Sequence, residues 1–208
     1  MRSIKPLIGP IYGIMGLVLY LFLAVVAFSF YPSSFGPVNN WLSDLGNNLL
    51  NPGGAIFYRL AGILSGTALL AFFLTLAYWT KGQRKGIRVL FLLVRVFGLI
   101  ASLSFIMTGV FSEDMMPMHS WFSITLYISF GTAIALTGIT VSFSKILPRW
   151  FAAFCFLAWA FDNVSGIFGQ TMWLEWVVVA FLLVCVATMS VFALKHNLTF
   201  QPQTRKKD

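Results

Sequence analysis

Six long apolar segments take up most of this 208-residue chain, and short polar connections separate them. A helix needs about 20 consecutive apolar residues to cross the hydrocarbon core of a bilayer, so each segment is long enough to span a membrane. The pattern predicts an all-α, polytopic membrane protein that forms a single domain over residues 1–208, with six transmembrane helices. The segments run roughly from Leu7 to Phe30, Ile56 to Trp79, Arg88 to Phe111, Ser120 to Phe143, Trp150 to Phe168 and Trp173 to Leu194.

The basic residues lie on alternate connections between these segments. All of the 14 lysines and arginines except Arg59 and Arg95 fall before the first segment, in the second-to-third and fourth-to-fifth connections, or in a basic tail over residues 195–208. Cytoplasmic loops of membrane proteins carry such an excess, so the pattern predicts a cell-membrane protein with cytoplasmic termini. Because the net charge of +8 is spread over short loops and the tail, nucleic-acid binding is not expected.

The longest connection, from Tyr31 to Ala55, contains apolar residues at three- and four-residue steps and has turn formers at both ends. This spacing predicts a short amphipathic helix that lies on the outer surface between the first two transmembrane helices. It would end before Pro52-Gly53-Gly54. Its apolar residues are Trp41, Leu42, Leu45, Leu49 and Leu50.

Three ionisable residues are expected at membrane depth, where they usually face a partner or water. Arg59 begins the second segment on the outer side, and we expect it to pair with Asp44 or with the Glu113-Asp114 pair, or else to bind an anionic headgroup. Arg95 either extends back to the inner headgroups or points into the bundle.

Asp162 lies in the outer part of the fifth segment. It is either a protonated or hydrogen-bonded acid that holds the bundle together, or a proton carrier or general acid/base.

Further acids cluster with a histidine on the outer side. Glu113 and Asp114 precede His119 at the start of the fourth segment, where they can anchor the helix start, sense pH or act as an acid/base pair. Their spacing matches no stereotyped metal motif, so no metal site is predicted. Glu175 opens the sixth segment, where an acid compensates the positive helix end. We expect an outer-facing pocket formed by Asp44, Arg59, Glu113, Asp114, His119, Asp162 and Glu175.

Four parts of the sequence together resemble the uncharacterised membrane family known as domain of unknown function 998. They are Ser43-Asp44-Leu45-Gly46, Asn51-Pro-Gly-Gly-Ala-Ile-Phe, the Gly-Val-Phe ending of the third segment with its acids, and His119 at the head of the fourth. The resemblance implies a six-span membrane fold, distantly related to DRAM-type and Sfk-type membrane proteins. It matches Asp44 to a loop acid and His119 to a histidine that heads the fourth helix. In place of a Gly-x-x-Glu-Arg-like run, this chain has Met172-Trp-Leu-Glu-Trp176.

Three functions remain open. The first is a lipid-associated binding, regulatory or structural role, with membrane lipids as partners and Arg59, Glu113, Asp114 and Glu175 as ligand-binding residues. The second is a membrane-embedded enzyme that acts on a lipid or isoprenoid substrate, with Asp44, His119 and Asp162 as candidate catalytic residues. The third is a proton or small-solute transporter. The sequence assigns no cofactor, and a homo-oligomer or a membrane-protein partner stays open.

Overall fold

The computed structural model describes residues 5–80, 83–144, 147–167 and 171–199, and all regular structure within these ranges is helical. Part of the predicted basic tail, residues 200–208, lies outside the described residues. The six long helices begin and end within a few residues of the six apolar segments. The elements are α1 (Lys5–Ser29), the 3-10 helix η1 (Leu42–Gly46), α2 (Ala55–Thr75), the 3-10 helix η2 (Leu76–Thr80), α3 (Lys85–Val110), α4 (Met118–Phe143), α5 (Arg149–Ile167) and α6 (Met172–Thr199).

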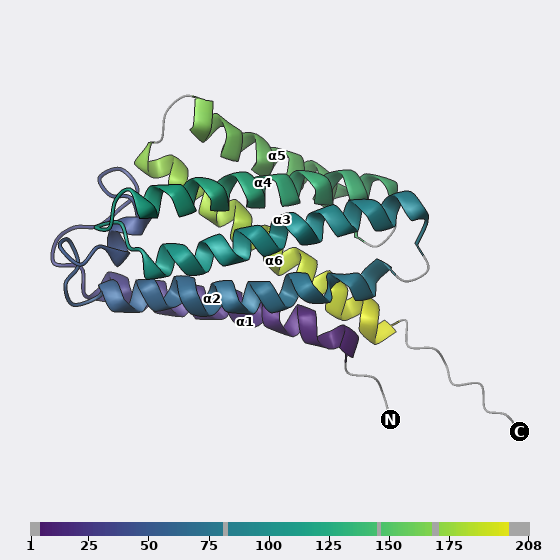
Figure 1. Cartoon of the computed structure of the whole chain (residues 1–208), viewed down its shortest axis with the longest axis horizontal. Helices are drawn as coiled ribbons and strands as arrows, with labels where there is room; N and C mark the ends of the chain where they lie inside the picture. The colour runs from purple at the N-terminus through teal and green to yellow at the C-terminus, as the bar shows by residue number, and fades with distance from the viewer. Residues whose placement is uncertain (1–4, 81–82, 145–146, 168–170, 200–208) are drawn as a thin grey trace, which may run out of the picture.

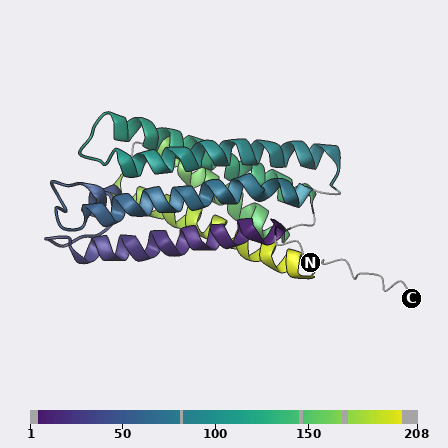
Figure 2. The same cartoon turned by 60° about the horizontal axis from the view of Figure 1, so that its bottom comes forward.

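The six long helices form an up-and-down ring. Each helix packs against the next one in the chain, and α6 packs against both α5 and α1, which closes the ring. The connections therefore gather at two opposite ends of the bundle (Figures 1 and 2). We call them the η1 end, where η1 and the α3–α4 connection lie, and the basic end, where α1 begins and the described part of α6 ends.

Five of the helical segments are long and apolar enough to cross a membrane. Many of their large apolar side chains are exposed, including Phe22 (64%) and Val25 (65%) on α1. Such contiguous apolar surface marks contact with lipid rather than water. The chain is therefore a multi-pass helical membrane protein. The five segments are Leu7–Ser29, Ala55–Tyr78, Lys85–Val110, Met118–Phe143 and Met172–Lys195.

Large apolar side chains fill the ring toward the basic end. Phe72 of α2 and Phe151 of α5 are fully buried there, and Phe73 meets Phe130 of α4 edge to ring face. Aromatic pairs in this arrangement stabilise a core beyond the area that they bury. The buried residues of this core are Phe72, Phe73, Leu76, Val94, Ala101, Phe130, Ile134, Val141, Leu147, Phe151, Ala152, Cys155, Ala158, Cys185, Val186 and Met189.

The helix observed between α1 and α2 differs from the predicted amphipathic surface helix. The observed helix is the five-residue η1, and its Leu42 and Leu45 are buried in one apolar cluster with Ala27 of α1. The helix η1 therefore covers the end of the ring. It ends early because the side chain of Asn47 accepts hydrogen bonds from the backbone N–H groups of Leu49 and Leu50. Such a local side-chain bond competes with helix continuation.

One fully buried asparagine fastens η1 to the ring. The side-chain amide of Asn51 donates to the carbonyls of Ala27 at the end of α1 and Leu45 in η1, both at 3.0 Å. Its side-chain oxygen accepts from the N–H of Gly54, just before α2. Gly54 has no room for a side chain, because a Cβ there would lie 2.5 Å from the Ala27 carbonyl oxygen. Asn51 thus ties together three segments beside the site described next.

Candidate functional site

Two adjoining cavities lie at the η1 end of the ring. The apolar chamber has a volume of about 110 Å³ and lies between α1, α2, α3, α4 and α6. The polar chamber, of about 290 Å³, lies between η1, the α3–α4 connection and the beginnings of α4 and α6. Because they share part of their lining, the two form one two-chamber pocket. The shared residues are Ser43, Glu113, His119, Ser123, Tyr127 and Glu175.

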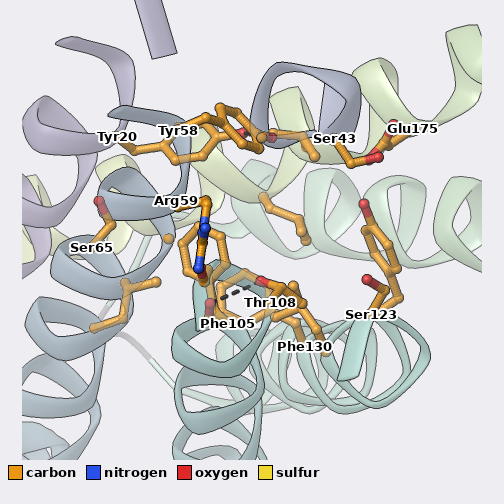
Figure 3. Close-up of a pocket in the computed structure, with 18 of the residues that line it drawn as sticks. Tyr20, Ser43, Tyr58, Arg59, Ser65, Phe105, Thr108, Ser123, Phe130 and Glu175 are labelled. Atoms are coloured by element: carbon orange, nitrogen blue, oxygen red, sulfur yellow. Dashed lines mark hydrogen bonds between the residues drawn. The ribbon is translucent and has the colours of Figure 1, made fainter. Parts of the chain in front are cut away.

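The two chambers differ in the side chains that line them. Leu17, Leu69, Phe105, Leu126 and Phe130 help to line the apolar chamber, whereas the residues of the shared boundary all carry carboxyl, imidazole or hydroxyl groups. Figure 3 shows how the walls are built from different helices, with Arg59 and Ser65 on one side of the pocket and Ser123 and Glu175 on the other. A molecule that spans both chambers therefore needs a polar end and an apolar end.

Glu175, in the first turn of α6, holds η1 in place as well as lining the pocket. Its Oε2 accepts a hydrogen bond of 2.7 Å from the backbone N–H of Leu42. Its carboxyl group also bonds to Ser43 in η1 and to the hydroxyl of Tyr127 in α4. A helix N-terminus favours an acid at this position, and the carboxyl group also joins α6, α4 and η1 around the boundary between the chambers.

A pair of carboxyl groups lies beside this boundary. Glu113, in the α3–α4 connection, lines both chambers, and the side chain of Asp44 in η1 is hydrogen-bonded to it. Burial raises the pKa of Glu113 to about 8, and the hydrogen bond and the negative charge of Asp44 add to this increase. Asp44 also accepts from the backbone N–H of Trp41, at 3.1 Å. Two adjacent carboxyl groups resist ionising together, so without a cation nearby this pair is stabilised by a retained proton.

His119 contributes an imidazole to the same boundary. Its Nδ1 lies 2.7 Å from the carbonyl oxygen of Phe111. Since a carbonyl oxygen only accepts hydrogen bonds, Nδ1 carries the proton, and in the neutral ring Nε2 is then the basic nitrogen. This bond anchors the start of α4 to the end of α3, and it also fixes the tautomer needed for acid/base chemistry.

Arg59 does not form the ion pair expected for it with any carboxylate in the described part of the chain. Its guanidinium donates instead to two backbone carbonyls at the end of α3, from Nε to Gly109 at 3.2 Å and from Nη2 to Val110 at 3.1 Å. The last carbonyls of a helix have no partner within the helix, which makes them good acceptors here. Arg59 also helps to line the apolar chamber.

Asp44, Asp114 and Asp162, which we expected to converge on the pocket with these residues, line neither chamber. Asp114 accepts a 2.9 Å hydrogen bond from Asn48 at the protein surface. Burial alone would raise its pKa, but the hydrogen bonds from Asn48 and Ser112 lower it below the ordinary value. Asp162 of α5 is buried against Gly131 of α4, where a Cβ would overlap its Oδ2. The Nε of Arg95 is buried, which favours the inward position for that side chain.

The sequence analysis did not identify several of the residues that line the pocket. Tyr20 of α1 and Tyr58 of α2 join their hydroxyl groups at 3.0 Å across the top of the apolar chamber. Ser65, deeper in α2, is 1% exposed, and its hydroxyl has no hydrogen-bond partner among the described residues. The available signal was the presence of tyrosine and serine inside apolar segments, but periodicity alone does not show which of them share a cavity.

The comparisons with known proteins place the chain in a family. Searches of curated proteins and of solved structures find no match. The model of one family, described as "Protein of unknown function (DUF998)", matches residues 14–196, which include α2 to α5, most of α1 and α6, and every residue of the pocket. The chain therefore belongs to the DUF998 family of proteins of unknown function.

Proposed function

We propose that this protein is a six-span membrane protein with both termini in the cytoplasm, and that it binds one amphipathic lipid in its two-chamber pocket. The observation that carries the proposal is the direct junction of a polar and an apolar chamber at the η1 end. Ligand pockets combine apolar walls with a few placed polar groups. Here the polar groups lie at one end, as the headgroup and tail of a lipid require.

The topology follows from the distribution of charge. The fifth helix, Arg149–Ile167, has 19 residues, which is within the range for a tilted span. It runs from the basic end toward the η1 end, so α6 begins on the same side as the pocket (Figure 1). With basic residues at the cytoplasmic face, the polar chamber opens toward the outer leaflet.

Impermeant maleimide should then label Asn48→Cys but not Arg84→Cys in intact cells, and the reverse pattern would refute this orientation.

Native mass spectrometry of the protein in mild detergent tests the lipid site. We expect one lipid to stay bound to the wild type. Ser123 lines both chambers, so Ser123→Phe should block their junction and release that lipid. Thr125, two residues along α4, is exposed, and Thr125→Phe adds the same bulk outside the pocket. Equal lipid retention by both variants would show that the lipid is bound only at the outer surface of the bundle.

A membrane-embedded enzyme acting on a lipid or isoprenoid substrate is the second candidate, favoured by the fixed tautomer of His119 beside Glu113. In this case Nε2 of His119 acts as the base at the headgroup end of the bound lipid. Asp44 acts only through Glu113, and Asp162 lies outside the chambers. The test is product formation from the retained lipid. Turnover by the wild type that His119→Gln abolishes without loss of lipid binding would establish the enzyme, whereas intact lipid would leave a binding protein.

A further inference from the structure

The lining of the pocket also indicates which headgroup it fits. Around the boundary lie the carboxyl groups of Glu113 and Glu175, and Asp44 is hydrogen-bonded to Glu113. Arg59 is the one basic side chain among the described lining residues, and two of its donor nitrogens already bind carbonyls. The site is therefore richer in acids than in bases. The acids and the histidine in the described ranges form no group of three that could hold a metal ion.

A second observation, independent of the acids, also points to a polar ligand. Ser65 helps to line the apolar chamber, and its hydroxyl is almost completely buried and has no partner among the described residues. A buried polar group without a hydrogen bond is costly, so its position calls for an acceptor on whatever fills the chamber. Ser65 lies six residues beyond Arg59 on α2, or about 9 Å deeper along the helix at 1.5 Å per residue.

We propose that the ligand is a phospholipid with a primary ammonium headgroup, and this inference rests on the lipid-binding function proposed above. The ammonium group donates to the carboxylates of Glu113 and Glu175, and the phosphate accepts from the guanidinium of Arg59. Below the phosphate, an ester carbonyl accepts from Ser65. The order of these groups along the lipid matches the order of the residues from the polar chamber into the apolar one.

The chemistry of the headgroup explains the expected selectivity. A primary ammonium carries three hydrogen-bond donors, so it can bond to both carboxylates at once and supply the missing positive charge. A trimethylammonium group of the choline type has the charge but no donor. A glycerol headgroup has hydroxyl donors but leaves the phosphate charge uncompensated beside Glu113 and Glu175. The wild type should therefore prefer ethanolamine over both.

The test is competition for delipidated protein in mixed micelles, read by native mass spectrometry. Equal amounts of phosphatidylethanolamine, phosphatidylcholine and phosphatidylglycerol with the same acyl chains are offered. We expect about a tenfold preference of the wild type for phosphatidylethanolamine, since a few charge-assisted hydrogen bonds are worth that much. In the Glu113→Gln/Glu175→Gln double variant the preference should disappear. Asp114→Asn makes the same kind of change outside the pocket and should keep it.

The outcomes separate this inference from the function on which it rests. Binding of one lipid without headgroup preference would overturn the inference and leave the lipid site intact. A preference for phosphatidylglycerol would also overturn it, because Arg59 rather than the acids would then dominate. If the wild type retained no lipid beyond the bulk, both proposals would fail.

Ser65 provides a separate test of how far the lipid extends into the apolar chamber. Ether-linked phosphatidylethanolamine lacks the carbonyl that Ser65 would bond, so the wild type should bind the ester-linked form several-fold more tightly. Ser65→Ala should bind both forms equally. Ser102→Ala is the matched control, because the Ser102 hydroxyl is buried but already donates to the Gly98 carbonyl at 2.7 Å. An ester preference that survives in Ser65→Ala would contradict the proposed placement of the lipid.

Discussion

The two ends of the helical ring differ in what their interiors contain. Toward the basic end, phenylalanine and aliphatic side chains fill the interior, with Phe72 and Phe151 fully buried. At the η1 end the interior is hollow, and carboxyl, hydroxyl and imidazole groups line the boundary between its two chambers. In lipid, helices associate through close packing and interhelical hydrogen bonds. The filled half therefore supplies most of the stability, which leaves the hollow half free to hold polar groups that a filled interior would exclude.

The largest expected effect comes from truncating a buried side chain in the filled half. Phe151→Ala should lower the free energy of unfolding by about 3–5 kcal/mol, the usual cost of removing a buried phenyl ring. Reversible unfolding by SDS in mixed micelles measures this loss. Phe22→Ala is the control, because Phe22 is 64% exposed on α1 and lipid replaces the lost contacts. Equal losses in the two variants would contradict the division of the ring into halves.

Removing the asparagine that holds η1 should have the next largest effect. Asn51→Ala removes the side-chain bonds to the carbonyls of Ala27 and Leu45. The Ala27 carbonyl keeps its bond from the backbone N–H of Phe30, so the main cost is the buried Leu45 carbonyl, at about 1–3 kcal/mol. We expect lower stability and faster proteolysis within residues 40–50, because η1 loses its attachment. Asn48→Ala, in the same connection but at the surface, should change neither measurement. Unchanged proteolysis in Asn51→Ala would show that η1 is held by its leucines alone.

The carboxyl pair in the hollow half should make the stability depend on pH. The folded protein raises the pKa of Glu113 from 4.5 to about 8, so the folded state retains a proton that the unfolded state loses. Stability should therefore be unaffected by this group below about pH 4.5, fall as the pH rises toward 8, and level off above it. Thermal unfolding between about pH 5.5 and pH 8.5 measures this slope.

Glu113→Gln should flatten that slope, since the amide does not titrate. Asp114→Asn should leave it unchanged, because the lowered pKa of Asp114 places its effect at more acidic pH, where stability is lost as that group is protonated. A slope that persists in Glu113→Gln would assign the pH dependence to another group.

The smallest expected effect distinguishes a buried hydroxyl that has no hydrogen-bond partner from one that already donates a hydrogen bond. Ser65→Ala should stabilise the lipid-free protein by about 1 kcal/mol, since it removes a buried hydroxyl without a partner. Ser102→Ala removes a hydroxyl that is bonded within α3 and should give no gain. Both values come from SDS unfolding of delipidated protein. A loss of stability in Ser65→Ala would mean that the hydroxyl already has a partner.

The sequence predicted the six helices closely because membrane spans depend on length and hydropathy, which are local properties. It also identified Arg59, Glu113, His119 and Glu175, which line the pocket. It did not predict that Arg59 donates to the carbonyls of α3, since backbone acceptors leave no trace in the side-chain pattern. The buried position of η1 was missed because the same spacing of leucines suits a membrane surface or a bundle interior. Ser65 and Tyr20 needed the three-dimensional arrangement, since they reach the chamber from different helices.

The contact between α6 and α1 sets the order in which the protein can be completed during its synthesis. The first helix is made long before the last, yet the two form adjacent walls of the ring. Until α6 inserts, the interior is open on one side, and Glu175 is not there to hold Leu42 of η1. A chain of five helices therefore lacks both one wall of the pocket and the anchor for η1, so the enclosed pocket can form only after α6 is in place.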